Sequence, residues 1–326
     1  MLDPGFFLAS LSKGWRPRVV AVYHGNEVVG IVYAKERIIS FIPTGIVYVD
    51  EGLGGFLLGN PDHRQNSLQV AVEAFIDSPR IRGLRLRLRQ GSDELVTVKR
   101  LIASRHLDAE FCHLVHNDSP LWKYHAHLPL TDNYEQFLNG LGKTTRHNFR
   151  YYRRRFETAG HHFVENLSVD ELRSAALDLY LKCKYTGRSQ QAEIKKGLDM
   201  VAAAHHPLAV GLKHFNGEWL SVIGGWYRPG AAVLRFQCND NRDFGSDSLS
   251  VVLRAFLIEQ LIRQGMTELS IWSDTAPPLS RYVTYVPMIG VRFDKSKFLS
   301  RLVHGLTSTV EPWLPKRLAA SAKWID

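Results

Sequence analysis

The sequence predicts an α/β protein with mixed β-sheets, built from two related halves in tandem. The composition is that of packed domains, with 45% hydrophobic and 22% charged residues, and 326 residues suit about two of them. Ser67–Ile76 (SLQVAVEAFI) and Ser248–Leu257 (SLSVVLRAFL) match at five of ten positions. The same order of expected elements surrounds both segments, which indicates a duplication.

Each element of the first half follows from a local pattern. We expect a hairpin over Val19–Tyr33, because two strand-like runs meet at the turn residues His24–Asn26. Apolar residues at helical spacing predict a helix over Ser67–Ile76. Strict alternation of Leu and Arg predicts a strand over Leu84–Arg89 with one basic face. That face is expected to be solvated, and a basic groove is the alternative. Its residues are Arg85, Arg87 and Arg89.

Three helices are expected between the repeats. The first begins within Leu128–Phe137, where Thr131 or Asp132 would be the N-cap and Glu135 would complete a capping box. The third begins at Ser168, which has Glu171 three residues on. The second and third helices cover Lys143–Glu157 and Ser168–Lys184.

The second half repeats the order of the first. Its hairpin is expected over Leu208–Tyr227, with a turn at Phe215–Gly217. A strand over Ala232–Cys238, the helix from Ser248 and a strand over Leu269–Trp272 follow. The predicted domains are therefore 1–122, 123–297 and a basic amphipathic tail over 298–326, which either packs on the body or contacts an anionic membrane surface.

Charge and cysteine usage narrow the class of protein. The net charge is +9, and 143–156 holds six basic residues and no acidic one. The three cysteines are far apart and lack metal-ligand spacing, so we expect no metal site and a reducing, cytoplasmic setting. Two adjacent histidine pairs are assigned to turns, His161–His162 and His205–His206. No Walker, dinucleotide-binding or GxSxG motif occurs, which disfavours NTPases, dehydrogenases and serine hydrolases.

A polar loop, Asn239–Ser248, joins the last strand of the second half to its helix. Such a loop before a helix N-terminus presents unpaired backbone N–H groups and the positive end of the helix dipole, which is how proteins hold pyrophosphates. Arg242 adds a fixed positive charge. In the alternative interpretation Ser246, Asp247 or Ser248 only caps the helix.

The loop and the basic segment resemble one family. Arg242-x-x-Gly245-x-Asp247 resembles the acyl-CoA pyrophosphate loop of GNAT acyltransferases, with Asp247 where that pattern has Gly or Ala. The run from Lys143 to Phe156 is similar to the Arg-rich helix of the cellulose-biosynthesis (CelD or BcsL) type of GNAT enzyme. The resemblance implies two GNAT-like domains, of which the second binds acetyl-CoA or another acyl-CoA. The cofactor-binding residues would then be Cys238, Asn239, Arg242, Gly245, Ser246 and Ser248.

The activity implied is acyl transfer to an amine or hydroxyl of a polar, anionic acceptor, such as a cell-envelope or exopolysaccharide precursor. Asp240 or Asp274 could take the proton of the acceptor, and Tyr282 could protonate the departing thiolate. The Arg-rich helix would hold anions of the substrate, although a solvated face or salt bridges would account for it equally. Its substrate-binding candidates are Arg146, Arg150, Arg153 and Arg154.

Two other classes of function stay open. Tandem GNAT folds also resemble Fem-type transferases, which move amino acids from aminoacyl-tRNA onto peptidoglycan precursors. Nucleic acid would be a partner only in that case. A non-enzymatic binder of anionic glycans or lipids would keep the basic helix and turn over no donor.

Overall fold

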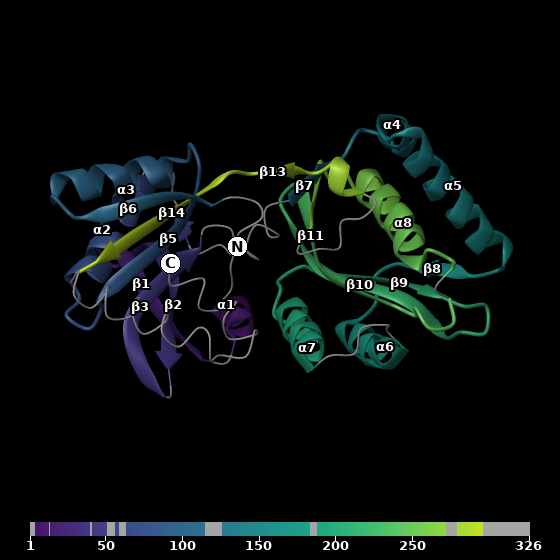
Figure 1. Cartoon of the computed structure of the whole chain (residues 1–326), viewed down its shortest axis with the longest axis horizontal. Helices are drawn as coiled ribbons and strands as arrows, with labels where there is room; N and C mark the ends of the chain where they lie inside the picture. Colours follow the sequence, from purple (N-terminus) through teal and green to yellow (C-terminus); the bar gives the residue numbers. More distant parts are fainter. Residues whose placement is uncertain are drawn as a thin grey trace, which may run out of the picture. The chain divides into compact units, whose positions relative to one another are not determined.

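The chain forms two α/β units, each with its own mixed β-sheet and core. The computed structural model describes residues 4–12, 14–39, 41–50, 56–58, 63–114, 126–182, 188–244, 246–271 and 279–295. Within these residues, the N-terminal unit comprises 14–113 with the strand β14, and the C-terminal unit comprises 114–287 with the helix α1 (Figure 1).

The sheet of the N-terminal unit is built from seven described strands in the order β1-β2-β3-β5-β14-β6, with β4 also paired to β2. Helices α2 and α3 pack against it, and their apolar faces form one core with the inward side chains of the strands. The strands are β1 (Trp15–His24), β2 (Glu27–Ile39), β3 (Ile42–Asp50), β4 (Phe56–Leu58), β5 (Gly83–Arg89), β6 (Ala109–Leu114) and β14 (Met288–Asp294). The helices are α2 (Arg64–Asp77) and α3 (Asp93–Ser104).

The sheet of the C-terminal unit also has seven described strands, in the order β13-β7-β12-β11-β10-β9-β8. Helices α4, α5 and α8 cover one face, and α6 and α7 cover the other (Figure 1). The strands are β7 (Ala126–Pro129), β8 (His162–Val164), β9 (Pro207–Lys213), β10 (Trp219–Arg228), β11 (Ala231–Asn239), β12 (Glu268–Ile271) and β13 (Thr284–Tyr285). The helices are α1 (Pro4–Ser10), α4 (Tyr134–Gly140), α5 (Lys143–Thr158), α6 (Val169–Lys182), α7 (Arg188–Ala202), α8 (Leu249–Arg263) and the 3₁₀ turn Leu279–Arg281.

The predicted duplication is visible in the strand pairing. In the N-terminal unit β1, β2 and β3 pair antiparallel in turn, and β3 pairs parallel with β5 across the helix α2. In the C-terminal unit β9, β10 and β11 pair antiparallel in turn, and β11 pairs parallel with β12 across α8. Both repeat segments, Ser67–Ile76 and Ser248–Leu257, thus belong to the crossover helix of their unit.

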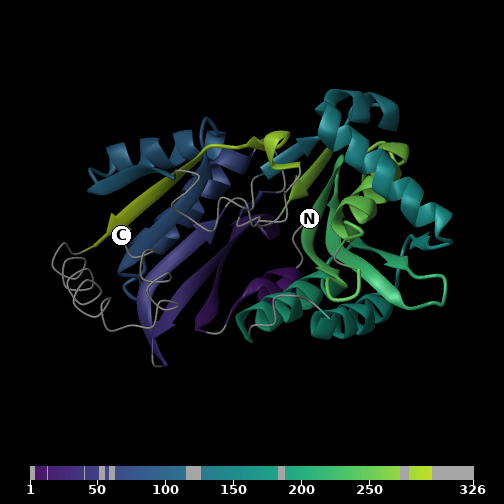
Figure 2. The ribbon, with the colours of Figure 1, turned by 45° about the vertical axis from the view of Figure 1, so that its right-hand side comes forward.

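The two ends of the described chain lie in units that differ from the predicted domains. β14 falls within predicted domain 123–297, yet it pairs antiparallel with β5, and its side chains Ile289, Val291 and Phe293 complete the core of the N-terminal unit. α1 falls within predicted domain 1–122, yet it packs on α7 of the C-terminal unit (Figure 2). Phe6 and Trp226 meet there with ring centroids 4.8 Å apart. Alternation specifies a strand but not the sheet that it joins. The predicted tail 298–326 lies outside the described residues.

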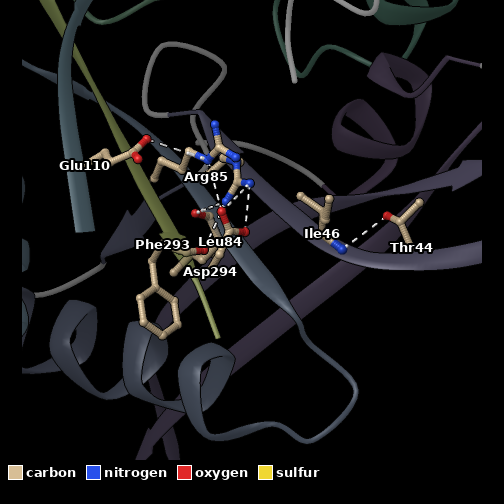
Figure 3. Close-up of polar contacts among 8 residues, drawn as sticks. Thr44, Ile46, Leu84, Arg85, Glu110, Phe293 and Asp294 are labelled. Atoms are coloured by element: carbon tan, nitrogen blue, oxygen red, sulfur yellow. Dashed lines mark hydrogen bonds and ion pairs between the residues drawn. The ribbon is translucent and has the colours of Figure 1, made fainter. Parts of the chain in front are cut away.

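The basic face of β5 is only partly solvated, which corrects the sequence expectation. Arg89 is exposed, but Arg87 is only 4% exposed and pairs with the buried Asp50 at 3.2 Å. Arg85 donates to both carboxylate oxygens of Asp294, at 2.8 and 3.0 Å (Figure 3). Acidic side chains on the neighbouring strands β3 and β14 thus neutralise Arg87 and Arg85, respectively.

Most local predictions around the middle helices are confirmed. Ser168 and Glu171 form the expected capping box at the start of α6, with reciprocal backbone hydrogen bonds of 2.9 and 3.2 Å. The N-cap of α4 is a different residue from those predicted: Asn133 accepts from the Gln136 N–H at 2.8 Å. His162 lies in β8 rather than in a turn.

Candidate functional site

A β-bulge in β11 shapes the approach to the predicted loop. The register with β10 shifts between Gly224 and Gly225, which leaves Arg235 as the extra residue. Leu234 therefore joins the core under α8, whereas Phe236, two residues on, joins the core under α6 and α7. A Cβ atom on Gly225 would lie 1.9 Å from the carbonyl oxygen of Val233, so only glycine fits opposite the bulge.

The end of β11 leads into the loop beyond its last partner on β12. The parallel pairing of these strands ends at Leu234↔Ile271, but β11 continues to Asn239. Cys238 is buried there, and the amide oxygen of Asn239 accepts from the Ser221 hydroxyl at 2.6 Å. Both predicted cofactor residues are therefore held in the strand, paired with β10.

Asp240 organises the loop from inside. Its side chain is fully buried, and one carboxylate oxygen accepts the N–H groups of Arg242 and Asp243 at 3.2 and 3.1 Å. The other oxygen lies 3.3 Å from the ammonium of Lys182 at the end of α6. This geometry suits a side chain that holds the loop better than it suits the base predicted from the sequence, since one oxygen accepts two N–H groups and the other lies beside an ammonium.

The loop ends in an open helix N-terminus. Ser248 is the N-cap of α8 in the left-handed conformation (φ 48°), and its side chain makes no capping bond. Its carbonyl accepts the first helical bonds, from the N–H groups of Val251 and Val252. The amides of Leu249 and Ser250 consequently have no acceptor among the described residues. Two donors therefore remain for a ligand.

The other described residues predicted in this loop, Arg242 and Ser246, are exposed. Arg242 is 64% exposed at its side chain and lies 3.6 Å from Asp243. Ser246 is exposed, and Gly245 lies outside the described residues. The loop thus carries its fixed charge on the surface.

Asp247, at the last motif position, pairs with the Arg-rich helix. Its carboxylate lies 2.8 Å from the guanidinium of Arg155 on α5. The pair borders a cavity of about 110 Å³ between α5, the loop and the start of α8. The cavity is lined by Tyr152, Arg155, Phe156, Ala159, His161, Leu220, Phe244, Asp247 and Leu249. Arg155 was not among the predicted site residues, although it belongs to the same basic run.

The predicted substrate-binding arginines on α5 have partners within the protein. Arg153 contacts Glu157 at 3.0 Å and Glu259 of α8 at 2.8 Å. Burial opposes its charged form, but the bonds to both glutamates outweigh burial and raise the pKa of Arg153. Arg150 pairs with Glu135.

The other two predicted arginines of α5, Arg146 and Arg154, differ from Arg150 and Arg153 in their partners. Arg146 donates to the amide oxygen of Asn139 at 3.2 Å. Arg154 is exposed and has no ion-pair partner in the described part of the chain. The salt-bridge interpretation therefore holds for Arg150 and Arg153, and Arg154 stays available to an anion.

The proposed acid, Tyr282, lies at the beginning of α5, away from the loop before α8. The Tyr282 hydroxyl accepts the Gly142 N–H at 2.7 Å, at the beginning of α5. Hydrogen bonding with Thr145, and then with the Gly142 N–H, lowers the pKa of Tyr282. At 1.5 Å per residue, Arg155 is about 20 Å further along the helix. Asp274 lies outside the described residues.

A polar cluster that sequence reasoning missed lies on the sheet face opposite α8. His127 on β7 and Ser270 on β12 are register partners, and the Glu268 carboxylate lies 2.5 Å from His127 Nδ1. This hydrogen bond lowers the pKa of Glu268. Nε2 of His127 is buried and without a partner. A carboxylate on Nδ1 with a free Nε2 is the arrangement that a histidine base needs. No local motif indicates it, because the three residues come from two separate strands.

A second missed feature adjoins the cavity. His161, His214 and Phe215 gather with Phe156 and Phe244 into what we call the aromatic cluster. The sequence placed Phe215 in a hairpin turn, which is correct, and gave no reason to bring that turn to the loop before α8. No cluster of three or more metal-ligating side chains occurs among the described residues.

Comparisons with known proteins bear on the fold. No family model matches the chain, and no curated protein matches it. Among solved structures it is similar to FemX, with a TM-score of 0.64 and 11% identity over 92% of this chain and 93% of that one. It is similar to L-PGS from Bacillus licheniformis, with a TM-score of 0.50 and 15% identity over 91% and 92% of the two chains.

A third structure, the C-terminal domain of a putative lysylphosphatidylglycerol synthetase from Agrobacterium fabrum, gives a TM-score of 0.51 and 12% identity over 94% and 91%. The predicted fold class is confirmed: the chain is a mixed α/β protein of two units in tandem with the same strand order, and it shares its fold with FemX. None of the described helices is long and apolar enough to cross a bilayer.

Proposed function

We propose that the chain is an acyltransferase that takes its acyl group from an acyl-CoA, with acetyl-CoA as the simplest donor. The observation that carries the proposal is the open start of α8. The Leu249 and Ser250 amides have no acceptor among the described residues, and they adjoin a cavity lined by Arg155. Free amides at the positive end of a helix, beside an arginine, suit the diphosphate of coenzyme A.

Asp247 sets the affinity of this site. Its carboxylate would repel a diphosphate, but Arg155 lies 2.8 Å away and neutralises it. A bound diphosphate would compete with Asp247 for the same guanidinium. We therefore expect the pair to loosen when the donor binds.

The transfer step needs a base and an acid. The acceptor nitrogen or oxygen attacks the thioester carbon, the C–S bond breaks, and the thiolate of coenzyme A leaves and takes up a proton. His127, held by Glu268, has the unpartnered Nε2 that a base needs, and it is our candidate base for an acceptor that approaches from the sheet face opposite α8. Tyr282 stays our candidate for the acid, and backbone N–H groups around Cys238 to Asp240, past the last pair of β11 with β12, would polarise the carbonyl.

The acceptor that we favour is a polar, anionic cell-envelope or exopolysaccharide precursor, as in the cellulose-biosynthesis type of enzyme. Arg154 is exposed and without an ion-pair partner among the described residues, so it can contact phosphate or carboxylate groups of such a precursor. A cytoplasmic setting, with peripheral contact at an anionic membrane surface, belongs to the same proposal.

A second candidate is an aminoacyl transferase that uses aminoacyl-tRNA and modifies a peptidoglycan precursor. The similarity to FemX over 92% of the chain favours it, since the Fem-type resemblance accounts for two units in tandem as well as the first proposal does. The open start of α8 suits the phosphates of an RNA equally.

Thermal unfolding with acetyl-CoA separates these candidates. If the first proposal holds, saturating acetyl-CoA should raise the melting temperature by about 5 °C, because a ligand at 100 times its Kd stabilises by about 2.7 kcal/mol. Arg155→Ala should remove most of this shift. Arg263→Ala, at the other end of α8, serves as the matched control, since its only ion pair in the described chain is with Glu165.

The outcome with RNA completes the test. No shift with any acyl-CoA, together with binding of charged tRNA in a filter assay, would establish the second candidate instead of the first. Binding of anionic glycans or lipids with neither donor bound would point to a non-enzymatic binder.

A further inference from the structure

The aromatic cluster is a group of five rings from four separate segments of the C-terminal unit. Phe156 lies in the last turn of α5, His161 follows that helix, His214 and Phe215 lie between β9 and β10, and Phe244 belongs to the loop before α8. His214 lies at the centre, with ring centroids 4.6 Å from His161, 4.1 Å from Phe215 and 5.6 Å from Phe244. His161 lies 5.2 Å from Phe156.

The cluster is not simply core. Phe215 is 66% exposed, and the rings of His161, His214 and Phe244 are only partly buried. The planes of Phe215 and His161 are 2° apart, so the two rings present parallel faces. Phe215 thus exposes most of a phenyl ring beside other partly open rings, and the ring of His214 is inclined to it by 37°.

The two histidines add hydrogen-bond donors to this surface. Nδ1 of His161 accepts the Phe215 N–H at 3.3 Å, and Nδ1 of His214 accepts the Asn216 N–H at 3.4 Å. In a neutral imidazole whose Nδ1 accepts, the proton lies on Nε2. Burial, and then the neighbouring His214, lowers the pKa of His161, which keeps its ring neutral near pH 7. Each ring therefore offers one N–H to an acceptor.

The surface adjoins the site proposed for the diphosphate. His161, Phe156 and Phe244 line the same cavity as Arg155, Asp247 and Leu249. The Asp247 N–H also donates to the Phe244 carbonyl at 3.1 Å, so one turn of the chain connects the aromatic cluster to the start of α8. A ligand with phosphates at α8 thus has aromatic rings within reach.

We propose that the aromatic cluster binds the adenine ring of an adenosine-bearing donor, stacked on the exposed ring of Phe215 and bordered by the inclined rings of His214 and Phe244, while its phosphates lie at the start of α8. An adenine supplies a π face for the rings and nitrogen acceptors for the histidine N–H groups, and its phosphates supply the charge for Arg155. The inference rests on the proposed function and assigns the part of the donor that this surface recognises. Both candidate donors carry such a group, as coenzyme A and as the 3′-terminal adenosine of tRNA.

The test is calorimetric titration of the full chain with fragments of the donor. The probes are coenzyme A, adenosine 3′,5′-bisphosphate and 4′-phosphopantetheine, which lacks the adenosine. Coenzyme A and the bisphosphate should bind, and 4′-phosphopantetheine should bind at least about tenfold more weakly than coenzyme A, because it loses the stacking on aromatic rings together with two of the three phosphates.

Variants locate the binding surface. Phe215→Ala and Phe244→Ala should each weaken coenzyme A and the bisphosphate by about tenfold and leave 4′-phosphopantetheine unchanged. Phe215→Trp should retain binding. Phe41→Ala is the matched control, because Phe41 is 98% exposed and belongs to the N-terminal unit. Phe215 is exposed, so its alanine variant should fold even if Phe244→Ala does not.

The outcomes distinguish this inference from the proposed function. If acetyl-CoA binds but the two alanine variants bind it as the wild type does, or if 4′-phosphopantetheine binds as tightly as coenzyme A, the adenine site is wrong and the acyltransferase proposal stands. An RNA hairpin ending in CCA that binds better than one ending in CCU, with no binding of coenzyme A, would keep the adenine site and overturn the acyl-CoA donor. Binding of none of the adenosine probes would overturn both.

Discussion

At the scale of single residues, the site depends on charges that the protein neutralises for itself. The basic run on α5 contains no acidic residue in sequence, but Glu135, Glu259 and Asp247 come to it from three other segments. Most of these pairs are at least partly exposed, so each contributes at most about 1 kcal/mol to stability. These pairs matter for binding, because an arginine that is paired within the protein is less available to an anionic ligand.

The pair of Asp247 with Arg155 predicts the direction in which the affinity for acetyl-CoA changes when Asp247 is replaced. Asp247→Asn should strengthen acetyl-CoA binding by up to about fivefold, because it removes a carboxylate from the phosphate site and frees Arg155. Isothermal titration of the variant measures the change. Asp243→Asn is the control, since Asp243 faces the exposed Arg242 instead. A weaker affinity in Asp247→Asn would show that Asp247 supports the site.

His161 makes the C-terminal unit sensitive to acid. Its pKa is lowered in the folded chain, so the unfolded chain binds a proton first as the pH falls. The stability that this residue contributes is therefore complete above its unfolded pKa of about 6.5 and is lost as the pH falls below that value. His161→Phe should reduce the loss of urea stability between pH 7 and pH 5. An unchanged slope in the variant would contradict this assignment.

At the scale of elements, the bulge in β11 determines where the strand's side chains point. Because it adds one residue opposite Gly224 and Gly225, Leu234 and Phe236 belong to different cores. The strand then reaches the loop in the orientation that turns the polar Gln237 and Asn239 away from Phe236 and Cys238. Bulges beside binding sites commonly serve this purpose.

Replacing the glycine opposite the bulge tests this account. Gly225→Ala should cost about 3 kcal/mol of unfolding free energy, because its Cβ would lie 1.9 Å from a backbone oxygen that cannot move aside freely. Urea denaturation measures the loss. Gly140→Ala, in α4, has no atom within 4 Å of the new Cβ and should be neutral or stabilising. Equal stabilities of the two variants would contradict the steric argument.

Local signals in the sequence were sufficient for both hairpins and for the helices α2, α4, α5, α6 and α8, whereas α1, α3 and α7 were not predicted. Ser168 and Glu171 predict the start of α6 because both partners lie within one turn. The bulge, the Arg155–Asp247 pair and the cluster of His127, Glu268 and Ser270 could not be predicted, since each brings together residues from separate segments. The loop before α8 was identified because its strand–loop–helix order is itself a local pattern, but the buried role of Asp240 depends on Lys182 from α6.

At the scale of the whole molecule, the first described helix, α1, belongs to the C-terminal unit and the last described strand, β14, belongs to the N-terminal unit. β14 pairs antiparallel with β5 in the N-terminal sheet, at the position that β7 takes beside β12 in the C-terminal sheet. The N-terminal unit therefore obtains its equivalent of β7 from the far end of the described chain. This explains why the domain boundaries read along the sequence differ from the units of the fold.

Because β14 belongs to the N-terminal sheet, a substitution in it should destabilise strands that are far from it in sequence. Val291→Asp places a charge at a side chain that is 3% exposed, which should cost more than about 3 kcal/mol. Hydrogen exchange should then accelerate across β3 and β5, far away in sequence. Val96→Asp, at an exposed position of α3, is the control and should leave exchange unchanged. Faster exchange only in 126–287 would contradict the assignment of β14.

The most direct measurement is a crystal structure of the chain with acetyl-CoA. The account requires the diphosphate at the start of α8, with its oxygens accepting the Leu249 and Ser250 amides and with Arg155 turned toward it. Electron density for the ligand only in the N-terminal unit, or an α8 start at which Asp247 rather than the ligand accepts from the Leu249 and Ser250 amides in crystals soaked to saturation, would contradict it.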